Sequence, residues 1–140
     1  MEFLEAFNRM MENTKDMALA TSVNDVPNVR IVSFYYDPQK KGVIYFSTIK
    51  MNPKAVEFSQ NNKVAFTTVP VGTIEHTRVT NATVQKSDLT ISDVKDAFIE
   101  KYPGYEMIIA QAGDMLDLYE IHFKEAAITL DFHKQGKITL

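Results

Sequence analysis

The sequence of 140 residues contains no cysteine and no tryptophan, and it has no long apolar run. Without cysteine, the chain forms no disulfide, offers no thiolate nucleophile and binds no metal through sulfur. Without a long apolar run, no segment has the length of a membrane-spanning helix. Basic residues are not in excess, because the net charge is −3, and a general nucleic-acid binder is usually basic. We therefore expect neither a nucleic acid nor a membrane as a partner.

Hydrophobic residues make up 45% of the chain and charged residues 24%, a balance typical of a globular domain. The length suffices for one domain with a substantial core, and no linker, internal repeat or low-complexity segment divides the sequence. We therefore expect a single domain over residues 1–140. The acidic, amphipathic residues 1–16 do not resemble a signal or transit peptide, which favours a cytoplasmic location.

The hydrophobic pattern predicts a few helices among many strands. The expected helices cover residues 2–13, 53–60, 87–100 and 105–112, with Ser87 or Ser92 as the cap of the third. The expected strands cover residues 17–23, 28–36, 43–48, 63–69, 73–85, 115–124 and 126–133, and a short final strand covers 137–140. The strand at 73–85 has no cleanly apolar face, so we expect it to bend or to lie beside a ligand or partner.

Short turns join most of these strands, and alternating β-α units are absent. This pattern favours a mainly β domain with flanking helices, built as an antiparallel barrel of six or seven strands.

Residues 28–58 contain a candidate anion site between two strands and a helix. Asn52 is a favoured N-cap, and Pro53 suits the first helical position. A helix N-terminus offers free backbone N–H groups and the positive end of the helix dipole. Arginine and lysine side chains complete a phosphate site well. The side chains that we expect to contribute are those of Arg30, Thr48 and Lys54.

Other polar residues have several interpretations. Without further support, Arg30 is more simply a solvated or salt-bridged side chain, and Lys50 is a solvated loop charge close enough in sequence to assist. Arg78 either pairs with Glu75 or another acidic group, or reaches a ligand. The three histidines, His76, His122 and His133, lack the spacing of a metal site, so we expect no metal. No catalytic residue is indicated, because no triad or carboxylate pair is visible.

Six segments, in this order and spacing, resemble the pyridoxamine 5'-phosphate oxidase-related family, the FMN-binding split β-barrels. They are residues 19–21 (LAT), 27–32 (PNVRIV), 44–48 (IYFST), 54–58 (KAVEF), 61–65 (NNKVA) and 78–82 (RVTNA). Position 81 is Asn where the family often has Gly. The chain also lacks a counterpart of the arginine-containing C-terminal segment by which pyridoxamine phosphate oxidases hold their substrate, so that specific activity is not expected.

The resemblance implies a homodimer with FMN bound in two clefts at the subunit interface. Arg30 and Lys54 would hold the phosphate, which carries about two negative charges at neutral pH. Main-chain groups near Val32 and Ser33 would face the isoalloxazine ring. The implied cofactor-binding residues are Arg30, Ile31, Val32, Ser33, Ser47, Thr48, Lys50, Asn52, Lys54 and Arg78.

Two functions follow from this resemblance. The first is a flavin-dependent oxidoreductase that reduces a small electron acceptor, whose identity the sequence does not indicate. The alternative is a non-enzymatic module that holds a flavin, haem or the deazaflavin cofactor F420 as a sensor or carrier.

Overall fold

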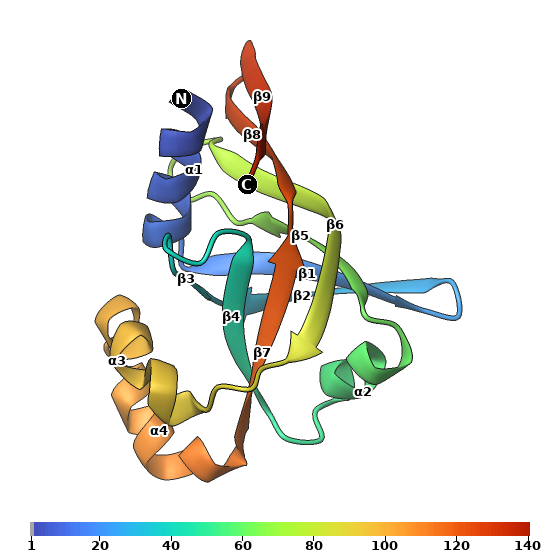
Figure 1. Cartoon of the computed structure of the whole chain (residues 1–140), viewed down its shortest axis with the longest axis vertical. Coiled ribbons are helices and arrows are strands. Elements are labelled where there is room, and N and C mark those ends of the chain that lie inside the picture. Colours follow the sequence, from blue (N-terminus) through green and yellow to red (C-terminus); the bar gives the residue numbers. More distant parts are fainter. Residues whose placement is uncertain (1) are drawn as a thin grey trace.

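The computed structural model describes residues 2–140, and Figure 1 shows their arrangement as one curled antiparallel sheet with helices outside it. The helices are α1 (Glu2–Asn13), α2 (Pro53–Gln60), α3 (Ile91–Lys101) and α4 (Tyr105–Ala112), and a 3-10 turn, η1, covers Gly113–Met115. The strands are β1 (Asp16–Val23), β2 (Val26–Ser33), β3 (Tyr35–Tyr36), β4 (Val43–Ile49), β5 (Lys63–Thr68), β6 (His76–Lys86), β7 (Leu116–Phe123), β8 (Glu125–Asp131) and β9 (Lys134–Thr139). The predicted fold class, a mainly β split barrel with flanking helices, is confirmed.

The sheet has nine strands in the described chain rather than the six or seven that we expected. Its main order is β2-β1-β5-β6-β7-β4-β3, and β8 pairs with both β6 and β9. One source of the difference is the predicted strand at residues 28–36, which is divided at Phe34. The part before Phe34 pairs with β1 and the part after it pairs with β4, so the two ends of the main sheet path meet at this residue. Phe34 therefore marks the seam of the barrel.

Side chains from the end of α3 replace the missing ladder contacts at this seam. The Phe34 N–H donates to the Tyr102 hydroxyl at 3.0 Å. The Phe34 carbonyl oxygen accepts hydrogen bonds from the Lys101 ammonium at 2.9 Å and from the Tyr102 hydroxyl at 2.6 Å. Because a buried backbone group needs a partner, these bonds explain how the strand can break at a fully buried phenylalanine.

The ends of the helices follow local sequence signals. The Asn52 side chain caps α2 by accepting the Lys54 N–H at 3.0 Å, as predicted. The cap of α3 is Thr90, which forms a capping box with Asp93, so the expected cap at Ser87 or Ser92 is wrong. The Ser87 hydroxyl instead donates to Glu120 on β7.

Strand β6 bends, as its mixed faces predicted. Val64 on β5 lies opposite Ala82 on β6, and Phe66 lies opposite Val79. The chain advances by two residues on β5 and by three on β6 between these pairs, so β6 has one extra residue. This bulge shifts the buried alternation and leaves both Thr80 and Asn81 exposed. Asn81 is not among the residues with positive φ, so this backbone conformation does not require the glycine that the family often has there.

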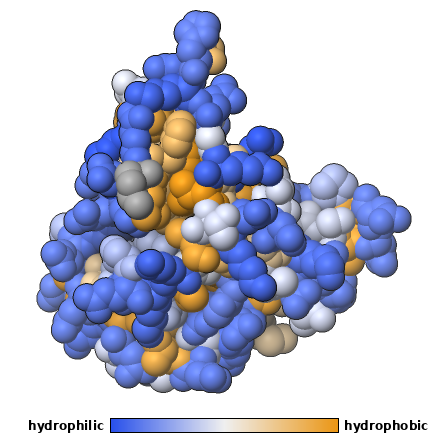
Figure 2. All heavy atoms as spheres, turned by 45° about the horizontal axis from the view of Figure 1, so that its top comes forward, coloured by the Kyte–Doolittle hydropathy of each residue, from blue (hydrophilic) through white to orange (hydrophobic). Residues whose placement is uncertain are grey.

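Two apolar clusters stabilise the fold. The larger fills the barrel, and the smaller lies between the outer face of β4 and β7 and the helices α3 and α4. Figure 2 shows apolar surface between the projecting β8–β9 hairpin and the body of the molecule. Leu130, Ile138 and Leu140 from this region pack partly buried against the larger cluster. Within residues 2–140, no helix combines the length and the apolar character needed to cross a membrane.

Candidate anion-binding site

Arg30 lies on the edge strand β2, and its side chain turns toward the barrel side of the sheet. The guanidinium Nη1 donates to the Thr21 hydroxyl at 2.8 Å and to the Leu19 carbonyl oxygen at 3.4 Å. Its Nη2 forms an ion pair with Glu57 of α2. Only about 20% of the Arg30 side chain is exposed, so this cation is fixed in place rather than solvated at the surface.

Glu57 is the acidic centre of the same cluster. Its carboxylate accepts hydrogen bonds from the Thr21 hydroxyl at 2.8 Å, from the Asn28 amide at 3.2 Å and from Arg30. These contacts lower the pKa of Glu57. The hydrogen bond from Thr21 has the largest effect, and the hydrogen bond from Asn28 and the charge of Arg30 add to it. The carboxylate is therefore ionised at neutral pH.

Lys54 supplies the second cation from the first turn of α2. Its ammonium lies 3.3 Å from the Asn52 side-chain oxygen. The pKa of Lys54 is lowered, mainly by burial and to a smaller extent by the positive charge of Arg30. Arg30 is ion-paired with Glu57, three residues after Lys54 on α2, so both cations lie beside this helix.

The main-chain N–H groups of the α2 N-terminus are already occupied, which corrects the expectation that they are free. Pro53 has no N–H, and the Lys54 N–H donates to the Asn52 side chain. The Ala55 N–H donates to the Asn52 main-chain oxygen at 2.9 Å. Side chains and the helix dipole therefore make this site, rather than open backbone donors.

Thr48 is a buried residue on the barrel side of β4. Among the described residues, its hydroxyl is the one buried side-chain oxygen or nitrogen without a hydrogen-bond partner. Burying an unpaired hydroxyl costs free energy, so a ligand group that supplies the missing bond would stabilise the protein.

The structure separates several other predicted residues from this cluster. The Ser47 hydroxyl lies on the opposite face of β4 and hydrogen-bonds the Tyr105 hydroxyl of α4. The Ser33 hydroxyl donates to Asp16 at 3.3 Å. Ile31 is exposed on the outer face of β2, while Val32 is buried in the core. Lys50 is exposed and lines a pocket with Lys86 and Asp114.

Arg78 lies away from Arg30. One row of the sheet register runs across four strands through Ile31, Ala18, Thr67 and Arg78. Arg78 therefore lies three strands away from β2, on the same outer face of the sheet as Ile31. Of the interpretations left open for Arg78, pairing with Glu75 is wrong, because Glu75 forms a two-point ion pair with Arg9 at 2.9 and 3.1 Å.

Sequence reasoning missed Thr21, Asn28 and Glu57. A signal for Glu57 is present, because residues three apart on a helix share a face and Glu57 follows Lys54 by three. The contacts from Thr21 and Asn28 depend on how α2 meets the β1–β2 hairpin, which local sequence does not encode.

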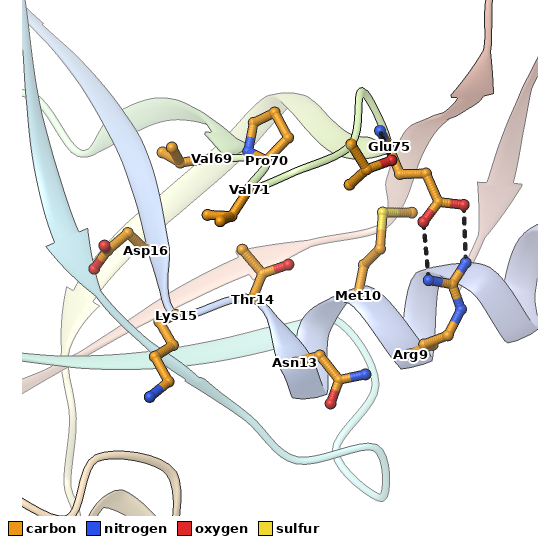
Figure 3. Close-up of a pocket in the computed structure, with 11 residues that line it drawn as sticks. Arg9, Met10, Asn13, Thr14, Lys15, Asp16, Val69, Pro70, Val71 and Glu75 are labelled. Carbon is orange, nitrogen blue, oxygen red and sulfur yellow. Dashed lines mark hydrogen bonds and ion pairs between the residues drawn. The ribbon is translucent and has the colours of Figure 1, made fainter.

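A pocket of about 450 Å³ lies between the end of α1 and the loop from β5 to β6. Figure 3 shows Arg9 and Glu75 joined at one side of it, with Lys15 and Asp16 near the other. Arg9 is paired with Glu75, and Lys15 is followed directly by Asp16. The two positive charges of the pocket are therefore balanced by two negative charges. It is a poorer candidate for a phosphate than the cluster beside α2.

The histidines also lie away from this cluster. The His76 Nδ1 lies 2.8 Å from the Ile74 carbonyl oxygen, and the His122 Nε2 lies 2.7 Å from a Glu120 carboxylate oxygen. His133 lies in the turn between β8 and β9. Within residues 2–140, no group of three or more histidine, aspartate or glutamate side chains is arranged to hold a metal ion.

The curled antiparallel sheet, its outer helices and the cationic cluster beside α2 define a split β-barrel with a candidate anion site. The chain belongs to the pyridoxamine 5'-phosphate oxidase-like family, whose model matches residues 10–135. No curated protein matches the chain.

Solved structures share this fold at low sequence identity. A NimC/NimA family protein from Clostridium acetobutylicum has 18% identity and a TM-score of 0.71, over 99% of this chain and 93% of its own. General Stress Protein 26 from Bacillus anthracis has 15% identity and a TM-score of 0.74, over 100% of both chains. A haem binding protein from Mycobacterium smegmatis has 9% identity and a TM-score of 0.76, over 96% of this chain and 57% of its own.

Proposed function

We propose that the protein is an FMN-binding oxidoreductase that acts as a homodimer and passes electrons from a reductant, through the flavin, to a small acceptor. One observation carries the proposal: Arg30 and Lys54 converge beside α2, and a single carboxylate opposes their two charges. This arrangement leaves an excess of positive charge for the phosphate of FMN. The flavin, when bound, supplies the redox chemistry.

The residues present fit such a phosphate in a second respect. The Thr48 hydroxyl is buried and has no partner within residues 2–140, and a phosphate oxygen is a strong acceptor for it. In this proposal Lys54 and Arg30 hold the phosphate, and Thr48 contributes a neutral donor.

The ring is proposed to lie along β2. This strand is at the end of the main sheet path and pairs with β1, so its other edge is not covered by a strand of the described chain. Main-chain groups near Val32 and Ser33 can then bond a polar heterocycle, as an unpaired edge offers both donors and acceptors.

The outer sheet face supports the homodimer. Val29 and Ile31 are about 60% exposed there, and the register places small residues beside them on the next strands. These neighbours are Ala18, Ala20, Ala65 and Thr67. A face of small and apolar side chains suits close contact with a second copy related by a two-fold axis, and a partner there would also cover the edge strand.

The alternative is a carrier or sensor without turnover, with a flavin, a deazaflavin or haem as its ligand. The similar fold of a haem binding protein gives this alternative weight. The Arg30–Lys54 cluster favours a phosphate over haem, because an axial ligand such as histidine is usual for haem iron and the three histidines lie elsewhere in the fold.

The test begins with protein produced with ample riboflavin and analysed without added ligand. We expect flavin absorbance, release of FMN on denaturation and a dimer by sedimentation. Stopped-flow mixing of the reduced protein with quinones, nitro compounds or oxygen should then show oxidation faster than that of free FMN. A haem spectrum, or colourless protein that fails to bind added FMN, would overturn the cofactor assignment. Binding without turnover would support the carrier.

A further inference from the structure

Glu57 is the unexpected member of the proposed phosphate site. Three donors from two strands converge on its carboxylate: the Thr21 hydroxyl, the Asn28 amide and the Arg30 guanidinium. A surface glutamate with a purely solvated role would not have three partners. Because the carboxylate occupies part of the Arg30 guanidinium, a phosphate held by Arg30, as proposed above, would have to approach this carboxylate.

The charge of the cluster follows from its three ionised side chains. Arg30 and Lys54 are cations, and Glu57 is an anion that occupies part of the Arg30 guanidinium. Together they leave one net positive charge. The pKa of Glu57 is lowered, mainly by the Thr21 hydroxyl, so the carboxylate keeps its charge under ordinary conditions. Arg30 is the charged group that shifts the pKa of both Glu57 and Lys54.

A doubly charged phosphate meets a specific difficulty at such a site. It must either displace Glu57 from Arg30 or remain beside an ionised carboxylate in a partly buried cluster. Like charges at close range are costly where solvent is partly excluded. A singly charged phosphate meets about half of this repulsion and is matched by the net charge of the cluster.

We infer that Glu57 is a specificity-determining residue: FMN still binds this site, but the carboxylate weakens its binding and makes the site favour a flavin with a singly charged phosphate, such as a phosphodiester, over one with a doubly charged phosphate. This inference rests on the proposed flavin site. It differs from a structural role of Glu57, in which the residue only fastens α2 to the β1–β2 hairpin. A structural role predicts a loss of stability on substitution and no change in the charge preference.

The experiment uses three probes that share the flavin ring and differ in phosphate charge. They are riboflavin, riboflavin 4′,5′-cyclic phosphate and FMN, with no charge, one and about two negative charges near pH 7.5. Dissociation constants are measured by flavin fluorescence for the wild-type protein and for Glu57→Gln. The glutamine keeps the shape of the side chain and removes its charge.

We expect the wild-type protein to bind the cyclic phosphate at least as tightly as FMN. In Glu57→Gln, FMN should bind about tenfold more tightly than in the wild type, whereas riboflavin should change by less than about twofold. An unchanged ratio of FMN to riboflavin affinity in a folded variant would overturn the inference and leave the flavin site standing. If none of the three probes binds either protein, the proposed function itself fails.

A second measurement needs no variant. Lowering the pH from about 7.5 to about 5.5 adds a proton to the FMN phosphate, whose second pKa is about 6, and leaves the cyclic phosphate unchanged. The wild-type protein should bind FMN more tightly at the lower pH, relative to the cyclic phosphate. A site that prefers the dianion would show the opposite change, and this result would contradict the inference even if Glu57→Gln failed to fold.

Discussion

The ammonium of Lys101 lies 2.9 Å from the carbonyl oxygen of Phe34 and 3.9 Å from the centre of the Phe34 ring. The same nitrogen donates to the Met11 carbonyl oxygen at 3.2 Å, so one side chain of α3 joins the seam of the barrel to the end of α1. A charged group is thereby placed in a largely buried position. Its protonation is consequently linked to the stability of the fold.

Burial lowers the pKa of Lys101 to about 8. Between this value and the usual lysine pKa near 10.5, the unfolded chain binds more protons than the folded one, so the free energy of unfolding should rise with pH. From about pH 7.5 to about 9.5 we expect a gain of about 1 kcal/mol, discounted for the remaining solvent exposure of the side chain. Urea unfolding at the two pH values measures it.

Lys101→Met provides the control for this pH effect, because the variant keeps an apolar stem and has no titrating group. It should lose the rise with pH. The range stays below pH 10, where the buried Tyr102, whose pKa is raised by burial, would introduce an opposite slope. Equal slopes in the two proteins would show that Lys101 does not titrate in this range.

Thr48→Val tests the unpaired hydroxyl. In the protein without ligand, the variant removes a buried oxygen that lacks a partner, and its unfolding free energy should increase by roughly 1 kcal/mol. If Thr48 donates to the phosphate, FMN should bind the same variant several-fold more weakly. Calorimetry of the ligand-free proteins and FMN titrations measure the two effects, and a gain in stability with unchanged FMN affinity would remove Thr48 from the site.

Lys54→Ala is expected to weaken FMN binding by at least about tenfold, because it removes one of two phosphate cations. Riboflavin binding should change much less. Lys50→Ala is the matched control, since Lys50 is an exposed lysine nearby in sequence that lines a different pocket, with Lys86 and Asp114. Equal effects of the two substitutions, or a loss of stability that parallels the loss of affinity, would indicate that Lys54 is structural.

Ile31→Asp tests the proposed dimer face. The side chain is about 60% exposed in the single chain, so the substitution should leave the monomer fold intact while it places a charge in the interface. Sedimentation with excess FMN should then show monomers, and FMN affinity should fall. Val71→Asp, at an exposed apolar residue in the loop before β6, is the control. A dimer that persists in Ile31→Asp would place the interface elsewhere.

Local signals explain why much of the fold is predictable. The apolar spacing of α1 and the Asn-Pro start of α2 gave the correct bounds of both helices. The break at Phe34 was not predictable, because its backbone partners are Lys101 and Tyr102, more than sixty residues away along the chain. Strand β9 begins three residues before the expected segment, because the chain turns at Phe132-His133 rather than at Gln135-Gly136, which lie within the strand.

The candidate site also combines features that local sequence predicts with features that depend on tertiary packing. Arg30 and Lys54, predicted from residue type and from the resemblance, both lie beside α2, because Arg30 pairs with Glu57 of the helix that Lys54 begins. Arg78 and Ser47 do not join them, because strand register and face decide where a side chain points. Glu57 was overlooked because its role depends on Thr21 and Asn28, which only the packing of α2 on the hairpin brings near.

The central claim is that a flavin phosphate binds beside α2. Its most direct test is a set of amide nitrogen–proton spectra of the labelled protein, recorded during titration with FMN and, separately, with riboflavin. If the phosphate binds there, the resonances of Lys54, Ala55 and Glu57 should shift with FMN and shift far less with riboflavin. Resonances of α2 that stay in place, while those around Arg9 and Glu75 move, would contradict it.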